Sequence, residues 1–352
     1  MLKSPTFKIA PIAAAAVLAL GSPAMALSEA AEAEFEAEIG EARAKMMGHS
    51  AAALEHARNA NKIARGESKK ARQARLTARW LEAEALMRLN RSGEASPIIE
   101  RALDETAGNF NGSKLHADLL RSHGSLQARQ GAFAKALPAF EEAQKLYKAL
   151  GEDRSRSIVL LSVGSVYSGA RDFDRALSHF QEAKAAFPDD PALSLSAHNN
   201  SGNALKGLGR HAEAESEFTL ALELAKAKGS PLLEARILTN IASAQVMDGR
   251  ADEAEKTALE AMALAREHAP NWSRFVDGVL AQVMLAKGNL TAAQAHIEQT
   301  FEGENLDATA AHFRDFHETA AQVYLSAGQK DQSERHTQAL ERLNAQVARI
   351  ER

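Results

Sequence analysis

Small and apolar residues recur along this chain with the spacing of amphipathic helices. In the clearest segment, Leu160, Gly164 and Tyr167 lie at positions i, i+4 and i+7, and the same spacing recurs within residues 176–183. Residues spaced in this way share one face of a helix. We therefore expect two amphipathic helices joined by a short turn, that is, a helical hairpin.

The hairpin pattern repeats about every 40 residues, because successive anchor residues are separated by 38 to 42 positions. The anchors are Ala53, Ala95, Ala136, Ala176, Ala214, Ala254, Ala293 and Ser333. A fixed period of this length is typical of repeat proteins, whereas a helical bundle needs no fixed period. The sequence therefore predicts an all-α solenoid of about eight hairpins, extending over residues 27–352.

Small residues occupy fixed places relative to these anchors. Five positions before the anchor stand Gly48, Gly131, Gly209, Gly249, Gly288 and Gly328. We interpret them as helix C-terminal residues with a left-handed backbone. Twelve positions before the anchor stand Ala83, Gly124, Gly164, Gly202, Ala242, Ala281 and Ala321. Only a small side chain there would let two helix backbones approach, so we predict a seam of small residues within each hairpin.

One unit resembles the tetratricopeptide repeat pattern at every characteristic position. The matching residues are Leu160, Val163, Gly164, Tyr167, Ala176, Phe180, Ala183 and Pro188. The other units are similar, but longer than the usual repeat of about 34 residues, like the long variants of kinesin light chains and several bacterial regulators. The resemblance covers about residues 30–345 and departs from the pattern at Glu41, His123, His198, Ser201 and Ser333. It implies a right-handed superhelix whose first helices line a concave face.

A polar stripe, offset from the seam, runs along each expected first helix. In tetratricopeptide domains that bind extended peptides, asparagines matching Asn200, Asn203 and Asn240 often bond to the peptide backbone, because a carboxamide both donates and accepts. The resemblance therefore implies a binding strip on the concave face. Its predicted members are Arg121, Ser125, Ser165, Asn199, Asn200, Asn203, Lys206, Arg236, Thr239, Asn240 and Ser243. The alternative is that these asparagines belong to the general repeat consensus and only cap the neighbouring hairpin.

The N-terminus has the pattern of a secretory signal peptide. Lys3 and Lys8 precede an apolar run of 12 residues, from Ile9 to Leu20, which is followed by Ala24-Met25-Ala26. The run is shorter than the roughly 20 residues that span a bilayer. We expect residues 1–26 to be removed and the mature chain to be periplasmic or secreted, the alternative being an uncleaved anchor.

Composition limits the partners and the chemistry of the mature chain. Cleavage after Ala26 would leave 46 acidic and 40 basic residues, a net charge of −6, which does not favour nucleic acid. The chain has no cysteine, so in an oxidising compartment packing alone must hold the fold. An acidic run from Ser28 to Glu41 could dock a partner, but a solvated capping helix is the simpler interpretation.

The chain contains partial matches to catalytic and metal-binding motifs, but each lacks a required residue or spacing. Gly202–Gly207 has the spacing of a phosphate loop, but Leu208 stands where the loop needs lysine. His312 and His317 are five positions apart rather than four, so we interpret them as solvated helix residues. Asp189-Asp190 lies between prolines and suits a helix cap. We expect no enzymatic activity, no cofactor and no metal.

These observations predict a non-catalytic scaffold or adaptor of the bacterial cell envelope that binds an extended protein or peptide segment. The layout is also similar to the extracytoplasmic repeat regions of some bacterial signalling proteins that carry a cyclase or histidine kinase. A sensory or regulatory protein is therefore one alternative, and a scaffold of an envelope assembly complex is another. The aromatic cluster from Trp272 to Phe275 could dock a partner, although packing under the neighbouring hairpin is the simpler interpretation.

Overall fold

Helices are the only regular elements among the described residues. A computed structural model describes residues 27–348, which contain 16 α-helices and three short 3-10 helices. The α-helices are α1 (Glu29–Lys45), α2 (Ser50–Ile63), α3 (Lys69–Arg88), α4 (Ser92–Asn109), α5 (Lys114–Arg129), α6 (Phe133–Leu150), α7 (Asp153–Gly169), α8 (Phe173–Ala186), α9 (Pro191–Gly207), α10 (His211–Ala227), α11 (Pro231–Met247), α12 (Ala251–His268), α13 (Ser273–Ala286), α14 (Leu290–Thr300), α15 (Arg314–Ser326) and α16 (Lys330–Ala348). The 3-10 helices are η1 (Pro270–Trp272), η2 (Leu306–Ala308) and η3 (Ala311–Phe313). The all-α class predicted from the sequence is confirmed.

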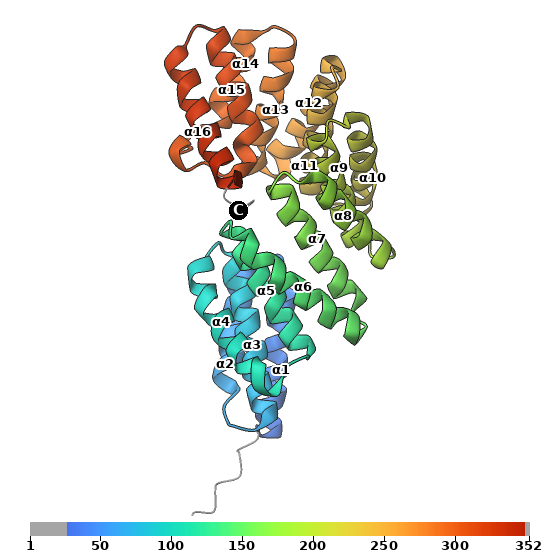
Figure 1. Ribbon diagram of the computed structural model, residues 1–352, viewed down its shortest axis with the longest axis vertical. Coiled ribbons are helices and arrows are strands. Elements are labelled where there is room, and N and C mark those ends of the chain that lie inside the picture. Colours follow the sequence, from blue (N-terminus) through green and yellow to red (C-terminus); the bar gives the residue numbers. More distant parts are fainter. Residues whose placement is uncertain (1–26, 349–352) are drawn as a thin grey trace, which may run out of the picture. The chain divides into compact units, whose positions relative to one another are not determined.

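Contacts pair consecutive helices into hairpins. From α5 onward, each odd-numbered helix packs on the even-numbered helix that follows it, and each hairpin contacts the next one along the chain (Figure 1). The first helices of neighbouring hairpins also contact one another, from α5 to α15. Such packing between sequence neighbours is the arrangement of an α-solenoid, as the sequence predicts.

The described part of the chain divides after residue 85 into two compact units. The first unit contains the α1–α2 hairpin and most of α3, and the second contains α4 to α16. The extent of the solenoid, residues 27–352, stays a prediction, and the expected signal peptide lies outside the described residues. Within residues 27–348, no helix combines the length and the apolar character needed to cross a membrane.

Each anchor residue is the fourth residue of the second helix in its hairpin. The turn before it contains a glycine with a positive φ at Gly131, Gly209, Gly249, Gly288 and Gly328. The prediction was wrong for Gly48, whose φ is not positive, and two other turns use Asn90 and Arg171 in the left-handed conformation. Since side chains other than glycine are strained there, Arg171 is an exception that needs a reason.

The predicted seam matches a small residue on one helix with a large residue on the next. A Cβ added to Gly202 would lie 2.5 Å from the ring of Phe218, and one added to Gly164 would lie 2.4 Å from Phe180. Both phenylalanines are fully buried. The phenylalanine ring occupies the place that the Cβ of any residue other than glycine would fill. This close packing fixes the register of the two helices.

Two polar features identified in the sequence have structural roles. Asp190 caps α9, as predicted, because its carboxylate accepts hydrogen bonds from the backbone N–H groups of Ala192 and Leu193. The acidic run forms α1, which buries Phe35 and Ile39 on its inner face. Most of its glutamates remain exposed, as expected for a solvated helix.

His317 corrects one prediction, because it is fully buried rather than solvated. Its Nδ1 lies 2.9 Å from Nδ1 of His336 on α16, and its Nε2 lies 2.9 Å from the hydroxyl of Thr309. Burial, followed by the charge of Arg342, lowers the pKa of His317 to about 4. Burial, followed by the charges of His317 and Arg335, lowers the pKa of His336 to about 4. Both imidazoles are therefore neutral in the folded protein at pH 7.

We expect the substitution Gly202→Ala to lower the melting temperature, because the added methyl group collides with Phe218. Overpacking of this kind costs about 1–3 kcal/mol. Thermal unfolding followed by circular dichroism measures the effect. Gly108→Ala, a helical position where an added Cβ meets nothing within 4 Å, is the control and should leave stability unchanged or raise it. An unchanged melting temperature for Gly202→Ala would contradict the seam.

The buried histidine pair predicts a loss of stability in acid. An unfolded histidine titrates near pH 6.5, so the unfolded state binds protons as the pH falls from 6.5 toward 4, while the folded state does not. Over that range the free energy of unfolding should fall by an amount on the order of a few kcal/mol. Melting curves between pH 7.5 and 4 measure this dependence.

The substitution His336→Phe should flatten this pH dependence, because one of the two titrating groups is removed. His268→Gln, at an exposed position, is the control and should leave it unchanged. An equally steep loss of stability in His336→Phe would show that other groups are responsible.

Candidate functional site

A cavity of about 640 Å³, lined by both polar and apolar side chains, lies along the first helices of the C-terminal hairpins. Helices α7, α9, α11, α13 and α15 all contribute to its wall. Eight of the residues predicted for the binding strip line it, namely Ser165, Asn200, Asn203, Lys206, Arg236, Thr239, Asn240 and Ser243. The structure thus brings these residues together in one place, which we call the groove.

Three predicted residues do not line the groove. Asn199 lies on α9 and contacts groove residues by hydrogen bonds. Arg121 and Ser125 lie on α5, an earlier hairpin. The buried hydroxyl of Tyr147 donates to Asp118 at 2.7 Å. Burial and the charge of Asp118 raise the pKa of this hydroxyl, and Arg121 lowers it by a smaller amount.

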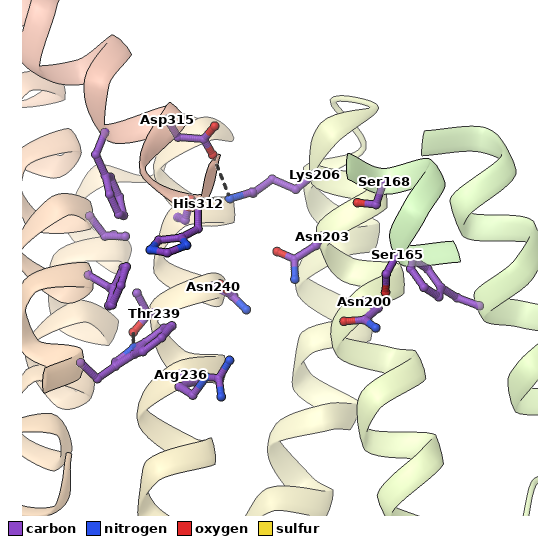
Figure 2. Close-up of a pocket in the computed structure, with 16 residues that line it drawn as sticks. Ser165, Ser168, Asn200, Asn203, Lys206, Arg236, Thr239, Asn240, His312 and Asp315 are labelled. Atoms are coloured by element: carbon purple, nitrogen blue, oxygen red, sulfur yellow. Dashed lines mark hydrogen bonds and ion pairs between the residues drawn. The ribbon is translucent and has the colours of Figure 1, made fainter. Parts of the chain in front are cut away.

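A chain of carboxamides orients the asparagines. Asn240 Nδ2 donates to Asn199 Oδ1 at 2.9 Å, and Asn199 Nδ2 lies 3.4 Å from Asn200 Oδ1. Asn203 Nδ2 donates to the backbone carbonyl of Asn199 at 3.1 Å. The acceptor oxygens of Asn203 and Asn240 and the donor group of Asn200 are consequently left for a ligand. Figure 2 shows Asn203 and Asn240 on two sides of one space, with Asn200 next to Ser165.

Three other predicted residues are engaged within the protein. Thr239 is buried, donates to the carbonyl of Ala235 and accepts the indole N–H of Trp272 at 3.0 Å. Lys206 donates to Ser243 Oγ at 3.2 Å, and its Nζ lies 3.5 Å from Asp315 Oδ2. Thr239 therefore positions an aromatic ring, and Lys206 joins two opposite walls of the groove (Figure 2).

Aromatic side chains form another part of the wall. The rings of Trp272 and Phe275 contact each other at a tilt of 30°, with centroids 4.3 Å apart, and Phe316 lines the same cavity. Trp272 and Phe275 also pack against the main hydrophobic core, as the simpler interpretation of this cluster expects. The guanidinium of Arg236 lies 4.8 Å from the Trp272 ring, a cation–π contact. Among the described residues, Arg236 forms no ion pair with an acidic side chain.

Sequence reasoning did not place His312, Asp315 or Phe316 in the groove. They come from η3 and α15, in the last hairpin, and meet α9 only because the intervening hairpins turn the chain. Burial lowers the pKa of His312; the smaller effect of Glu304 raises it, and that of Arg274 lowers it further. No local sequence pattern predicts that η3 and α15 lie near α9, because their positions depend on the accumulated rotation of several hairpins.

The groove combines hydrogen-bonding groups with an apolar surface. Among residues 27–348, no group of three histidine, aspartate or glutamate side chains is placed to hold a metal ion. Carboxamides, one guanidinium and an aromatic wall recognise backbone amides and apolar side chains.

The family model described as Tetratricopeptide repeat matches residues 115–189 and residues 193–267. The first match covers α5 to α8 and the second covers α9 to α12, which include the part of the groove with the asparagines. A comparison with curated proteins finds no match.

Solved structures share the fold over most of the chain. The apo form of the quorum sensor NprR from B. thuringiensis has a TM-score of 0.67 at 13% identity, over 88% of this chain and 87% of that one. A Rap protein complexed with Competence and Sporulation Factor has a TM-score of 0.63 at 14% identity, over 91% of this chain and 99% of that one. A tetratricopeptide repeat protein from Parabacteroides merdae has a TM-score of 0.53 at 17% identity, over 78% and 96%. At these identities the similarity concerns the fold alone.

Proposed function

This chain is a tetratricopeptide repeat protein, and we propose that its groove binds an extended peptide segment of a partner protein. The observation that carries the proposal is the orientation of Asn200, Asn203 and Asn240. Their hydrogen bonds within the protein leave acceptors and a donor directed at one cavity. An extended peptide presents alternating N–H and C=O groups, which this set can satisfy without regard to its side chains.

The aromatic wall supplies the apolar part of the interaction. Trp272, Phe275 and Phe316 line the same cavity as the asparagines and offer an apolar surface for one or two apolar side chains. The cavity of about 640 Å³ is in the range of ordinary ligand sites. Because Trp272 is held by Thr239 and the asparagines by one another, little side-chain freedom is lost on binding.

The role that we propose for the protein is that of an adaptor or scaffold without catalysis. A regulatory role is the second candidate, and the solved structures favour it over a purely structural one. One of them is a quorum sensor, and another is a Rap protein complexed with Competence and Sporulation Factor. By analogy, binding in the groove of this chain would change its affinity for a signalling partner.

We further propose that the protein acts outside the cytoplasm after export. The support is the signal-peptide pattern, with Lys3 and Lys8 before an apolar run and Ala24-Met25-Ala26 after it.

Export predicts that the protein isolated from the cell envelope or the medium begins at Leu27. Edman degradation or mass spectrometry of the N-terminal peptide identifies this residue. Replacing Ala24 and Ala26 by bulky residues should block cleavage and retain the longer chain. A wild-type envelope protein that still begins at Met1 would contradict the proposed processing.

If the groove binds peptide, a variant with Asn200→Ala, Asn203→Ala and Asn240→Ala should lose peptide binding. Three hydrogen bonds of about 1 kcal/mol each correspond to roughly a 100-fold weaker affinity. Heptapeptides selected on the wild-type protein from a random display library supply the probe, and fluorescence anisotropy measures the dissociation constants. The same variant should lose partners in affinity capture from the envelope fraction, while its helicity stays unchanged.

Asn59→Ala with Asn109→Ala is the matched control, because both asparagines lie outside the groove. It should bind the selected peptides like the wild type. Equal affinity of the triple variant and the wild type would reject this site, and a library that yields no binding peptide would reject the proposed function.

A further inference from the structure

A second cavity of about 770 Å³ adjoins the groove and collects basic side chains from separate hairpins. Arg171 comes from the α7–α8 turn, His211 from the start of α10 and Arg314 from the start of α15. The two cavities share five residues: Ser168, Asn203, Lys206, His312 and Asp315. A ligand in the groove can therefore extend into this second cavity, which we call the basic cavity.

Arg171 is held in a strained backbone conformation. Its φ is 61°, at the turn position where five other hairpins use glycine. Its guanidinium lies 5.3 Å from the ring of Phe173, which also lines the basic cavity. Since glycine would fit this turn without strain, the turn does not explain the arginine. A residue kept in such a conformation points to a role for its side chain.

Arg314 lines the basic cavity together with Arg171. Its guanidinium donates to the side chain of Asn344 and, at 3.0 Å, to the carbonyl of Leu343. Burial, followed by the charge of Arg171, lowers the pKa of Arg314, while Asp315 raises it. Both guanidiniums line one cavity, and an anion bound there would offset their like charges.

The acidic groups nearby do not neutralise these arginines. Within the described part of the chain, neither Arg171 nor Arg314 forms an ion pair with a carboxylate. Asp315 is paired with Lys206, and Glu318, the other acid of the cavity, is exposed.

His211 adds an unused polar atom. Its Nδ1 is buried and has no hydrogen-bond partner among the described residues. A buried polar atom without a partner costs free energy, and the His211 residue itself lines the basic cavity.

We propose that the basic cavity binds an oxyanion between Arg171 and Arg314, with His211 as a further donor. The oxyanion is either a carboxylate of a peptide lying in the groove or a free phosphate. The peptide source rests on the proposed function, and the phosphate source does not. In the first case the cavity selects acidic peptides and fixes the direction in which they lie.

Arg171→Gly provides a clean test, because it removes the guanidinium and installs the residue that other hairpins use in this turn. Its melting temperature should equal or exceed that of the wild type. Arg314→Gln is a second variant that keeps a donor toward Leu343 and Asn344. Arg101→Gln, at an exposed position outside both cavities, controls for the change in net charge.

Two probes distinguish the sources. The first is inorganic phosphate, compared with chloride at equal ionic strength in thermal unfolding. The second is a pair of synthetic heptapeptide libraries, identical except that one ends in glutamate with a free carboxylate and the other in glutamine amide. We expect the acidic library to bind the wild type at least about tenfold more tightly. Arg171→Gly and Arg314→Gln should abolish this preference, and Arg101→Gln should keep it.

The outcomes separate this inference from the proposed function. Binding of both libraries with equal affinity, without stabilisation by phosphate beyond that by chloride, overturns the oxyanion site and leaves the groove intact. Stabilisation by phosphate that is lost in Arg171→Gly, with no binding of either library, supports the oxyanion site with phosphate as its source and rejects the peptide groove. A preference for acidic peptides that persists in Arg171→Gly and Arg314→Gln overturns the proposal.

Discussion

Close approach of two helix backbones is the constraint on which the rest of this structure depends. At Gly124, Gly164 and Gly202 the missing side chain leaves room for a phenylalanine ring from the second helix of the same hairpin. Where the first helix carries alanine instead, as at Ala242 and Ala281, the facing position holds Ala258 or Ile297. The sizes of the two partners compensate, so each hairpin keeps a closely packed interior despite few aromatic residues.

The seam also determines where function can lie. When one face of each first helix is committed to its partner, the residues offset from that face stand in equivalent places in consecutive hairpins. Ser165, Asn203 and Ser243 occupy one such position, and Asn200 and Asn240 occupy another. Stacking of the hairpins turns these equivalent positions into neighbouring rows, and the rows form the wall of one cavity. Because the same packing recurs in each repeat, the polar side chains of neighbouring repeats form one continuous surface.

The sequence predicts those features that are local to one hairpin or its neighbour. The period, the helix pairs, the seam and the central asparagines all follow from spacing and helical geometry. Features that join distant hairpins could not be predicted, because they depend on small rotations accumulated over several repeats. The Lys206–Asp315 pair, the approach of Arg171 to Arg314 and the placement of Phe316 belong to this class.

The burial of individual polar residues could also not be predicted from the spacing of residues along the chain. His317 looks solvated in sequence, yet Thr309, Phe301 and His336 enclose it. The segment that includes η2 and η3 is an irregular connection without periodicity, and nothing in its composition reveals that it covers the last hairpin. Gly48 illustrates the converse error, since a recurrent position need not adopt the recurrent backbone conformation in a terminal repeat.

The most direct measurement is the fluorescence of Trp272 during titration with a selected peptide. The chain has two tryptophans, so the substitution Trp80→Phe leaves Trp272, in the groove wall, as the only reporter. Binding in the groove predicts a saturable change in emission and weaker quenching by acrylamide, with the dissociation constant found by anisotropy. Peptide binding that leaves both properties of Trp272 unchanged would contradict a ligand in the groove.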